Sequence, residues 1–391
     1  MRWDSQSGPV HSLFYENEPF DGHETEVFAY YASPSTLAGQ ADPASAVKSD
    51  KQREKFPGVV LIHGGGGTAF SEWAWLWAKR GYAAIAMDLG GCKPFDPKYD
   101  DKGVPVLNQT AKPDTRTRLP NGGPDQGHPA KFDTIGGAVS DDWPYHAVAA
   151  AIRAHSLLRS MDEVDADHTA VTGISWGGYT TCLVASLDNR FQAAVPVYGC
   201  GFLFEGESVQ KPSIDKLSDR RDQWIQTYDP SSYLGRCRVP MLMVNGTNDV
   251  HYPLDSYFKS YERIAGPKQL RIQVRMPHSH PAGWAPQEIG LFIDSYCHSG
   301  KPLPRTGSLQ KNGDKVEMSV ESSTTIPTAE LHYTTDTGLR SDRTWKSIPA
   351  TFMPGKVVAD LPPSEATTWY LSVTDERGAM VSGPIQFGSL P

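Results

Sequence analysis

One serine in this 391-residue chain stands in a setting that suits a nucleophile. Residues 173–179 read GISWGGY, so Ser175 lies between glycines, after the run HTAVT and before the run YTTCLVASL. These flanks predict a buried strand, a sharp turn and a helix, a context that exposes a serine hydroxyl and lets the backbone pass close to it. A Ser/Gly turn without chemistry is the alternative. We interpret Ser175 as the nucleophile, because other residues supply the groups that a serine needs.

A serine hydroxyl is a weak nucleophile, so it needs a base within hydrogen-bond reach and a carboxylate that orients the base. Asp249 follows a predicted strand, VPMLMVN, and is the candidate acid, with Asp255 in reserve. Two histidines, His278 and His280, follow the predicted strand LRIQVRM in the run MPHSHPAGW. We favour His278 as the base because it comes first after the strand and a small residue follows it. His280 stays open as the alternative.

The oxyanion that forms when an acyl group is attacked needs backbone N–H donors aimed at it. The run HGGGG, residues 63–67, ends an apolar stretch, and residues without a Cβ let N–H groups approach a substrate. We expect donors from Trp176 and from one of Gly65 or Gly66. A phosphate-binding loop is the alternative, but the Lys-Ser/Thr pair that a P-loop requires does not follow. Further residues near these motifs that we expect to contact the substrate are His63, Tyr198, His251 and Trp284.

The segments that carry these residues alternate between short apolar runs and helical stretches. Strands are predicted over 24–32, 58–63, 82–88, 169–173, 192–199, 239–245 and 270–276. Helices are predicted after the serine and over 71–81, 141–160 and 285–297, and a polar loop over 33–57. This alternation predicts an α/β fold with a wound, mostly parallel sheet flanked by helices.

Two stretches depart from this alternation. Residues 91–135 are dense in Pro, Gly and Asp and predict an insert that serves as a lid or as one wall of a cleft. After residue 300, short alternating runs separated by turn signals such as DERG predict a small all-β sandwich of immunoglobulin or fibronectin type. The linker is SGKPLPRTGS. We therefore predict a catalytic domain over 1–299 and a β-sandwich domain over 300–391.

Composition narrows the classes of partner. The formal net charge of -8 and the lack of a basic stripe argue against nucleic acid. No apolar run is long enough to span a membrane. The start, MRWDSQSGPV, does not read as a signal peptide, so the expected compartment is the cytoplasm, or the periplasm or exterior if a signal was trimmed. Five cysteines, at 92, 182, 200, 237 and 297, fit no metal or disulfide spacing. We expect free, mostly buried thiols, with one disulfide as the alternative, and no metal. The oligomeric state stays open.

Taken together, HGGGG, GISWGGY, VNGTND and MPHSHPAGW resemble the motifs of the α/β-hydrolase superfamily, over about residues 20–298. The order serine, acid, histidine is the order of that superfamily. The chain resembles most the dienelactone hydrolase-like and acetyl xylan esterase-like members, with kinship to the prolyl oligopeptidase type. This resemblance implies a triad of Ser175, Asp249 and one of His278 or His280. The segment after residue 300 resembles domains appended to some bacterial hydrolases of this branch.

Three departures narrow what the resemblance implies. The nucleophile is serine, whereas dienelactone hydrolases proper use cysteine. Oligopeptidases carry a propeller domain before the hydrolase motifs, and this sequence shows none. Glucuronoyl esterases carry an arginine after the serine, whereas here a tryptophan follows it. The resemblance therefore implies a serine carboxylic ester hydrolase that works through an acyl-enzyme without a cofactor, on an acetylated or feruloylated carbohydrate. A peptidase or amidase with the same triad, and an inactive carbohydrate-binding or scaffold protein, are the alternatives.

Overall fold

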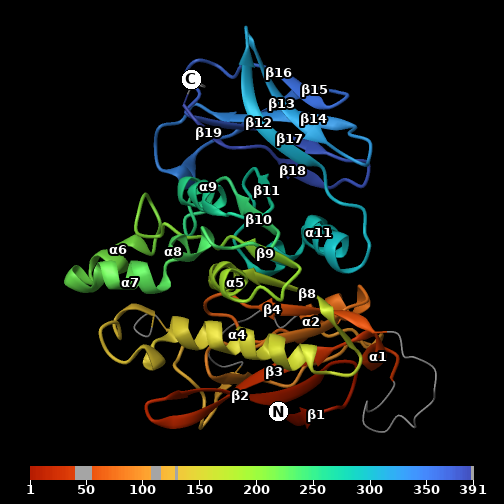
Figure 1. Cartoon of the computed structure of the whole chain (residues 1–391), viewed down its shortest axis with the longest axis vertical. Helices are drawn as coiled ribbons and strands as arrows, with labels where there is room; N and C mark the ends of the chain where they lie inside the picture. The colour runs from red at the N-terminus through yellow and green to blue at the C-terminus, as the bar shows by residue number, and fades with distance from the viewer. Residues whose placement is uncertain (40–54, 107–115, 128–130, 389–391) are drawn as a thin grey trace.

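The computed structural model describes residues 1–39, 55–106, 116–127 and 131–388. Its larger part is a mixed sheet in the order β1-β2-β3-β5-β4-β8-β9-β10-β11 (Figure 1). The strands from β5 to β11 pair in parallel, and β1, β2 and β3 join them in antiparallel fashion. The strands are β1 Arg2–Ser5, β2 His11–Phe20, β3 His23–Ala32, β4 Phe56–Ile62, β5 Ala83–Met87, β8 Val164–Ile174, β9 Ala193–Val197, β10 Met241–Gly246 and β11 Lys268–Gln273.

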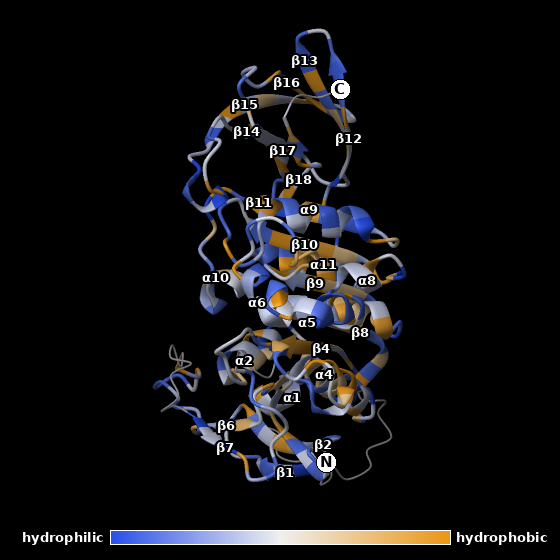
Figure 2. Ribbon diagram, turned by 90° about the vertical axis from the view of Figure 1, so that its left-hand side faces the viewer, coloured by the Kyte–Doolittle hydropathy of each residue, from blue (hydrophilic) through white to orange (hydrophobic). Residues whose placement is uncertain are grey.

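Helices cover both faces of this sheet. On one face α2 (Ser71–Lys79) lies beside α11 (Gln287–Cys297), and Arg80 pairs with Asp294 between them at 2.6 Å. On the other face α4 (Trp143–Arg159) packs beside α5 (Trp176–Leu187), followed by α8 (Ser231–Leu234) and α9 (Leu254–Arg263). Strands β5 and β9 are buried at every position, as strands covered on both faces require. Figure 2 shows the hydrophobic residues concentrated on these inner strands and on the helix sides that meet them.

Eight further strands, all paired in antiparallel fashion, form the C-terminal part (Figure 1). They are β12 Arg305–Asn312, β13 Lys315–Glu321, β14 Thr328–Thr334, β15 Lys346–Met353, β16 Lys356–Asp360, β17 Thr368–Thr374, β18 Met380–Ser382 and β19 Gln386–Phe387. We call this set, residues 305–387, the C-terminal β-unit. It joins the larger sheet directly, because β18 pairs with β11 where Leu270 lies opposite Ser382. The expected all-β character is confirmed, and its assignment to the immunoglobulin or fibronectin type stays a prediction.

Several elements differ from the expectations. Strands β1, β2 and β15 were not expected, and β12 begins at Arg305, inside the segment expected to be a linker. The segment 91–135, in which no strand was expected, contains two short strands, because β6 (Cys92–Pro94) pairs with β7 (Arg116–Arg118). The predicted loop 33–57 begins with α1 (Pro34–Leu37), and its residues 40–54 lie outside the described residues. All five cysteines are free and buried, which confirms that expectation.

The remaining short helices lie in connections between the strands. They are α6 Lys211–Asp215, α7 Arg221–Tyr228, α10 His280–Trp284, η2 Val139–Asp141, η3 Ser218–Arg220 and η4 Arg340–Asp342. Within the described ranges, none of the helices combines the length and the apolar character that a membrane crossing needs.

Candidate active site

Ser175 occupies the turn between β8 and α5 in a backbone conformation that L-residues rarely adopt. Its φ is 59° and its ψ is -116°, and such strain costs about 1–3 kcal/mol. The turn is held by two backbone hydrogen bonds, from the Ser175 amide to the Val197 carbonyl at 2.8 Å and from the Tyr179 amide to the Ser175 carbonyl at 2.9 Å. Glycine is required at position 177, because a Cβ there would overlap the Ile62 carbonyl oxygen. The surrounding fold therefore holds the half-buried serine at the tip of the turn that the sequence predicted.

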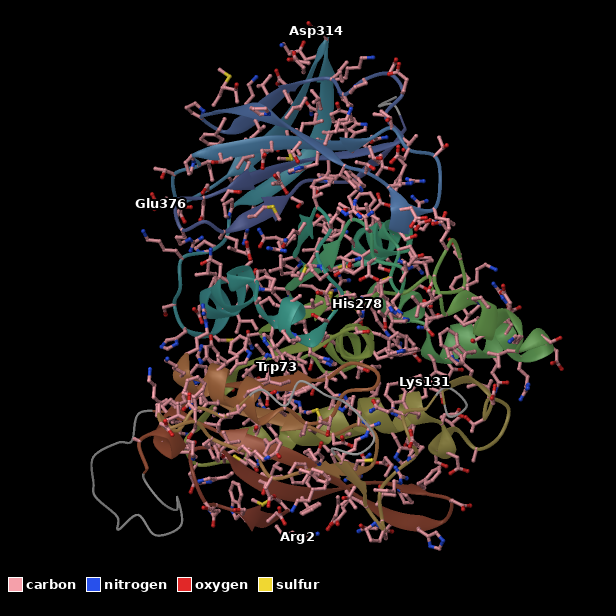
Figure 3. The ribbon with its side chains drawn as sticks, turned by 180° about the vertical axis from the view of Figure 1, so that it is seen from behind. Arg2, Trp73, Lys131, His278, Asp314 and Glu376 are labelled. Atoms are coloured by element: carbon pink, nitrogen blue, oxygen red, sulfur yellow. The ribbon has the colours of Figure 1, made fainter. Side chains whose placement is uncertain are left out.

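His278 and Asp249 complete a hydrogen-bonded chain with this serine. The Nε2 atom of His278 lies 3.0 Å from Ser175 Oγ, and its Nδ1 atom lies 2.6 Å from Asp249 Oδ2. The other carboxylate oxygen accepts the backbone amides of His251 at 2.8 Å and Tyr252 at 2.9 Å. Because an ionised carboxylate only accepts hydrogen bonds, the proton of a neutral imidazole belongs on Nδ1, and Nε2 is left to accept the serine proton. Figure 3 shows His278 near the middle of the molecule, below the C-terminal β-unit.

His280 has a different position from His278, although the two are separated by a single residue. It is the first residue of α10, whose N-terminus is capped by the Ser279 side chain accepting the Ala282 amide at 3.2 Å. Its Nε2 accepts the Gly64 amide at 2.9 Å. Burial, with a smaller contribution from neighbouring histidines, lowers the pKa of His280 to about 3, so the ring is neutral and remains an acceptor. The structure thus brings His278 to the serine and His280 to the glycine loop.

The glycine loop, residues 64–67, is held at both ends. His63 Nδ1 donates to the Gly64 carbonyl at 2.7 Å, and the Gly67 amide donates to the same oxygen at 3.0 Å. The Gly67 carbonyl accepts from Arg116 Nη1 at 2.5 Å and from Gln126 Nε2 at 2.7 Å. Both of these side chains come from the segment 91–135. Part of that segment therefore packs against the loop beside Ser175.

Between these fixed ends, Gly65 and Gly66 are exposed. Their amides donate no hydrogen bond to any residue in the described part of the chain. Gly66 has a φ of 72°, a conformation that favours glycine, and a Cβ on Gly65 would come within 2.6 Å of the Trp176 indole. The Trp176 amide is at the first position of α5, where helix amides lack intrahelical partners. Free N–H groups from two segments thus flank the serine.

The four residues expected to contact substrate have different surroundings. His63 is buried under the glycine loop, and its Nε2 accepts the Leu89 amide at 2.9 Å. Burial lowers the pKa of His63 to about 4, so it is neutral. Tyr198 is also buried, donates its hydroxyl to the Pro277 carbonyl at 2.6 Å and stacks on the His278 ring at 4.4 Å. The polar atoms of these two side chains are engaged within the protein, where they support the loop and the imidazole, and their contact with substrate stays a prediction.

His251 and Trp284 lie closer to the surface. The half-buried His251 ring is 4.5 Å from the His278 ring, and its pKa is lowered by burial and then by the neighbouring imidazole. Trp284 packs against Trp73, with ring centres 5.5 Å apart, and both line a surface hollow of about 280 Å³ between α2 and α11. The reserve acid, Asp255, pairs with Arg340 at 3.1 Å, whereas Asp249 contacts the imidazole.

Two side chains near the Ser175 turn were not anticipated by any motif. The Tyr252 side chain is fully buried, and its hydroxyl faces the Ser175 side chain. Burial raises the pKa of this phenol well above its ordinary value, so it keeps its proton. Lys131 Nζ lies 5.1 Å from the centre of the Trp176 ring, and burial lowers the pKa of Lys131 to about 8. No motif marks either residue, although Lys131 belongs to the segment 91–135 that was expected near the site.

The described residues contain no group of three or more His, Cys, Asp or Glu side chains arranged to hold a metal ion. The chemistry that these side chains can perform is nucleophilic attack by an oxygen atom, with proton transfer through an imidazole.

The order of strands, the helices on both faces and the serine turn at the end of β8 define an α/β-hydrolase fold. The family model described as acetyl xylan esterase (AXE1) matches residues 3–209, which is 207 of the 391 residues. The chain belongs to this acetyl xylan esterase family and is a carboxylic ester hydrolase. A second model, described as PhoPQ-activated pathogenicity-related protein, matches residues 198–343.

Several solved structures are similar to this chain, and an acetyl xylan esterase among them shows the same fold. The acetyl xylan esterase from Paenibacillus sp. R4 is 21% identical, with a TM-score of 0.53, and the match covers 75% of this chain and 86% of that one. Acetyl xylan esterase 1 from Thermoanaerobacterium sp. JW/SL YS485 is 16% identical, covering 76% and 87%, with a TM-score of 0.49. An acylaminoacyl peptidase from Pyrococcus horikoshii is 16% identical, covering 74% and 42%, with a TM-score of 0.48.

Proposed function

We propose that Ser175, His278 and Asp249 hydrolyse an acetyl ester of a carbohydrate through a covalent acyl-enzyme. The observation that carries the proposal is the continuous hydrogen-bonded chain from Ser175 Oγ to His278 Nε2 and from His278 Nδ1 to Asp249, at 3.0 and 2.6 Å. Membership of the acetyl xylan esterase family supports the choice of an acetylated sugar, and a feruloylated one is the second choice.

In the first step, His278 Nε2 takes the serine proton while Ser175 Oγ attacks the ester carbonyl carbon. Asp249 holds the imidazole in the required tautomer and stabilises the imidazolium. The amide of Trp176 and that of Gly65 or Gly66 donate to the oxygen that becomes negative. The imidazolium then protonates the departing alcohol, and a water molecule activated by His278 releases the acid and restores the serine.

We further propose that the hydrolase activity resides in residues 1–299, with 300–391 as a second domain. The segment 91–135 forms one wall of the substrate site in this proposal. Contacts of three of its side chains support that assignment, because Arg116 and Gln126 bind the Gly67 carbonyl and Lys131 lies against Trp176.

Release of acetate from acetylated xylan and from p-nitrophenyl acetate tests the proposal. Ser175→Ala should lower kcat on both substrates by at least about 10⁴-fold, because the nucleophile is lost. Ser186→Ala is the matched control, since Ser186 lies on the same helix and its hydroxyl donates to the Cys182 carbonyl at 2.7 Å. A fluorophosphonate should label the wild type at residue 175 and leave Ser175→Ala unlabelled.

The outcomes separate the mechanism from the substrate. Turnover of p-nitrophenyl acetate without turnover of acetylated xylan would support the serine esterase mechanism and contradict the carbohydrate substrate. Faster cleavage of an acyl anilide than of the matching ester would favour an amidase. Equal activity of wild type and Ser175→Ala would overturn the assigned nucleophile, and a wild type inactive on every ester would overturn the proposed function.

A further inference from the structure

The C-terminal β-unit contacts the turn that carries Asp249. The side-chain amide of Asn248, the residue immediately before Asp249, points into the loop that contains η4. We call this loop, residues 339–343, the η4 loop. Its Nδ2 donates to the carbonyls of Arg340 at 3.2 Å, Ser341 at 2.9 Å and Arg343 at 2.8 Å. Three carbonyls thus converge on one amide group and share its two hydrogens.

Arg340 adds a second attachment on the far side of the same turn. Its guanidinium pairs with Asp255 in the first turn of α9 at 3.1 Å, and both side chains are only 19% exposed. Its backbone amide donates to the Glu207 carboxylate at 2.9 Å. A partly shielded pair with hydrogen-bond geometry holds its partners more firmly than an exposed surface pair.

The segment around Glu207 also contacts the acid turn. The Ser208 hydroxyl donates to the His251 carbonyl at 2.8 Å, and the Val209 amide donates to the Val250 carbonyl at 3.1 Å. Residues 248–251 therefore contact both the segment that contains Glu207 and the η4 loop, although the Val250 side chain is exposed. The carboxylate that must stay 2.6 Å from His278 Nδ1 lies within this stretch.

A second contact between the two parts of the chain lies elsewhere. β18 pairs with β11, and the Tyr370 hydroxyl donates to the Ile272 carbonyl at 3.1 Å. This contact joins the sheets without contacting residues 248–251. It therefore offers a matched control, because it can be weakened while the η4 loop is left intact.

We infer that the η4 loop of the C-terminal β-unit is a positioning element for the active site, in which Asn248 and Arg340 fix the turn that presents Asp249 to His278. The inference rests on the proposed roles of Ser175, His278 and Asp249. The C-terminal β-unit thus has a role in catalysis for which it does not need to bind substrate itself. Misplacing a catalytic group by about 1 Å can cost about 10²-fold in rate, so loosening this turn should lower turnover without weakening substrate binding.

The test compares Asn248→Ala, Arg340→Ala and Arg340→Lys with Tyr370→Phe in the full chain. On p-nitrophenyl acetate, Asn248→Ala and Arg340→Ala should lower kcat by about 5- to 100-fold and leave KM within about twofold. Arg340→Lys should recover most of the loss, because an ammonium group can still pair with Asp255. Tyr370→Phe should keep kcat within about twofold of the wild type. Hydrogen exchange of the peptide covering 246–254 should accelerate in the first two variants only.

Two results would overturn the inference. Wild-type kcat and wild-type exchange in Asn248→Ala and Arg340→Ala would show that Asp249 holds its place without the η4 loop. Equal losses in Tyr370→Phe, together with a lower melting temperature in every variant, would show a general effect of the interface. A wild type inactive on all esters would instead refute the proposed function, and the exchange measurement would still decide whether the loop fixes the turn.

Discussion

Replacing His280 with alanine tests whether catalysis depends on the fixed glycine loop. His280 Nε2 accepts the Gly64 amide at 2.9 Å, and a Cβ on Gly64 would come within 3.1 Å of the Ser175 Cβ. Losing the imidazole leaves the Gly64 amide without its acceptor, which costs about 1–3 kcal/mol where water cannot replace it. Movement of the loop relieves this cost but displaces the free amides of Gly65 and Gly66. If this whole cost of about 1–3 kcal/mol raises the free energy of the transition state, the rate falls by about 5- to 150-fold.

The assay measures kcat and KM for p-nitrophenyl acetate in four proteins. His280→Ala should lower kcat by the range above, with KM nearly unchanged, because the donors act on the oxyanion and not on the ground-state ester. His278→Ala should lower kcat by at least about 10⁴-fold, since it removes the base. His168→Ala is the control, because the side chain of His168 is half exposed and pairs with Asp165 on the surface.

Two results would refute this reasoning. Equal inactivity of folded His280→Ala and His278→Ala would mean that His280 belongs to the proton-transfer chain itself. Wild-type kcat in His280→Ala would mean that the glycine loop keeps its position through His63, Arg116 and Gln126 alone.

Three further predictions follow from the packing and the titration of buried groups. Gly177→Ala should lower the free energy of unfolding in urea by at least about 2 kcal/mol, because the added Cβ overlaps the Ile62 carbonyl. Gly338→Ala is the control, since a Cβ there meets nothing within 4 Å. Equal stability of the two variants would contradict the reasoning. Tyr252→Phe removes a fully buried hydroxyl that faces the Ser175 side chain, so the free energy of unfolding in urea should change by no more than about 1 kcal/mol. Its kcat should fall about 3- to 10-fold if the hydroxyl supports Ser175, and an unchanged kcat would show that the hydroxyl is idle. Burial lowers the pKa of His63 and of His332 to about 4 in the folded chain, from about 6.5 when unfolded, so their contribution to stability is complete above about pH 6.5 and is lost as the pH falls. Each of these histidines should lower the free energy of unfolding by about 2 kcal/mol when the pH falls from 7 to 5. His332→Gln should reduce the difference in unfolding free energy between the two pH values by about this amount. An unreduced difference would contradict the lowered pKa of His332.

Local patterns were sufficient to predict most of the larger sheet. Runs such as VVLI and AAIAM are apolar throughout, as is typical of a strand covered on both faces, and they became part of β4 and β5. Strands β1, β12 and β15 escaped prediction because they are largely exposed, so their side chains carry little of the apolar alternation that marks a strand.

The sequence by itself determined which types of residue follow which strands. A serine between glycines after β8, an acid after β10 and histidines after β11 must meet at one edge of a parallel sheet, because the carboxyl ends of parallel strands lie together. Only the tertiary structure decided between two histidines that are separated by one residue. The chain after β11 places His278 against Asp249 and Ser175, and the start of α10 then turns His280 toward Gly64. It also decided that Tyr198 and His63 support the site from inside, and that the C-terminal β-unit contacts the acid turn, since such contacts join residues far apart in the chain and leave no local pattern.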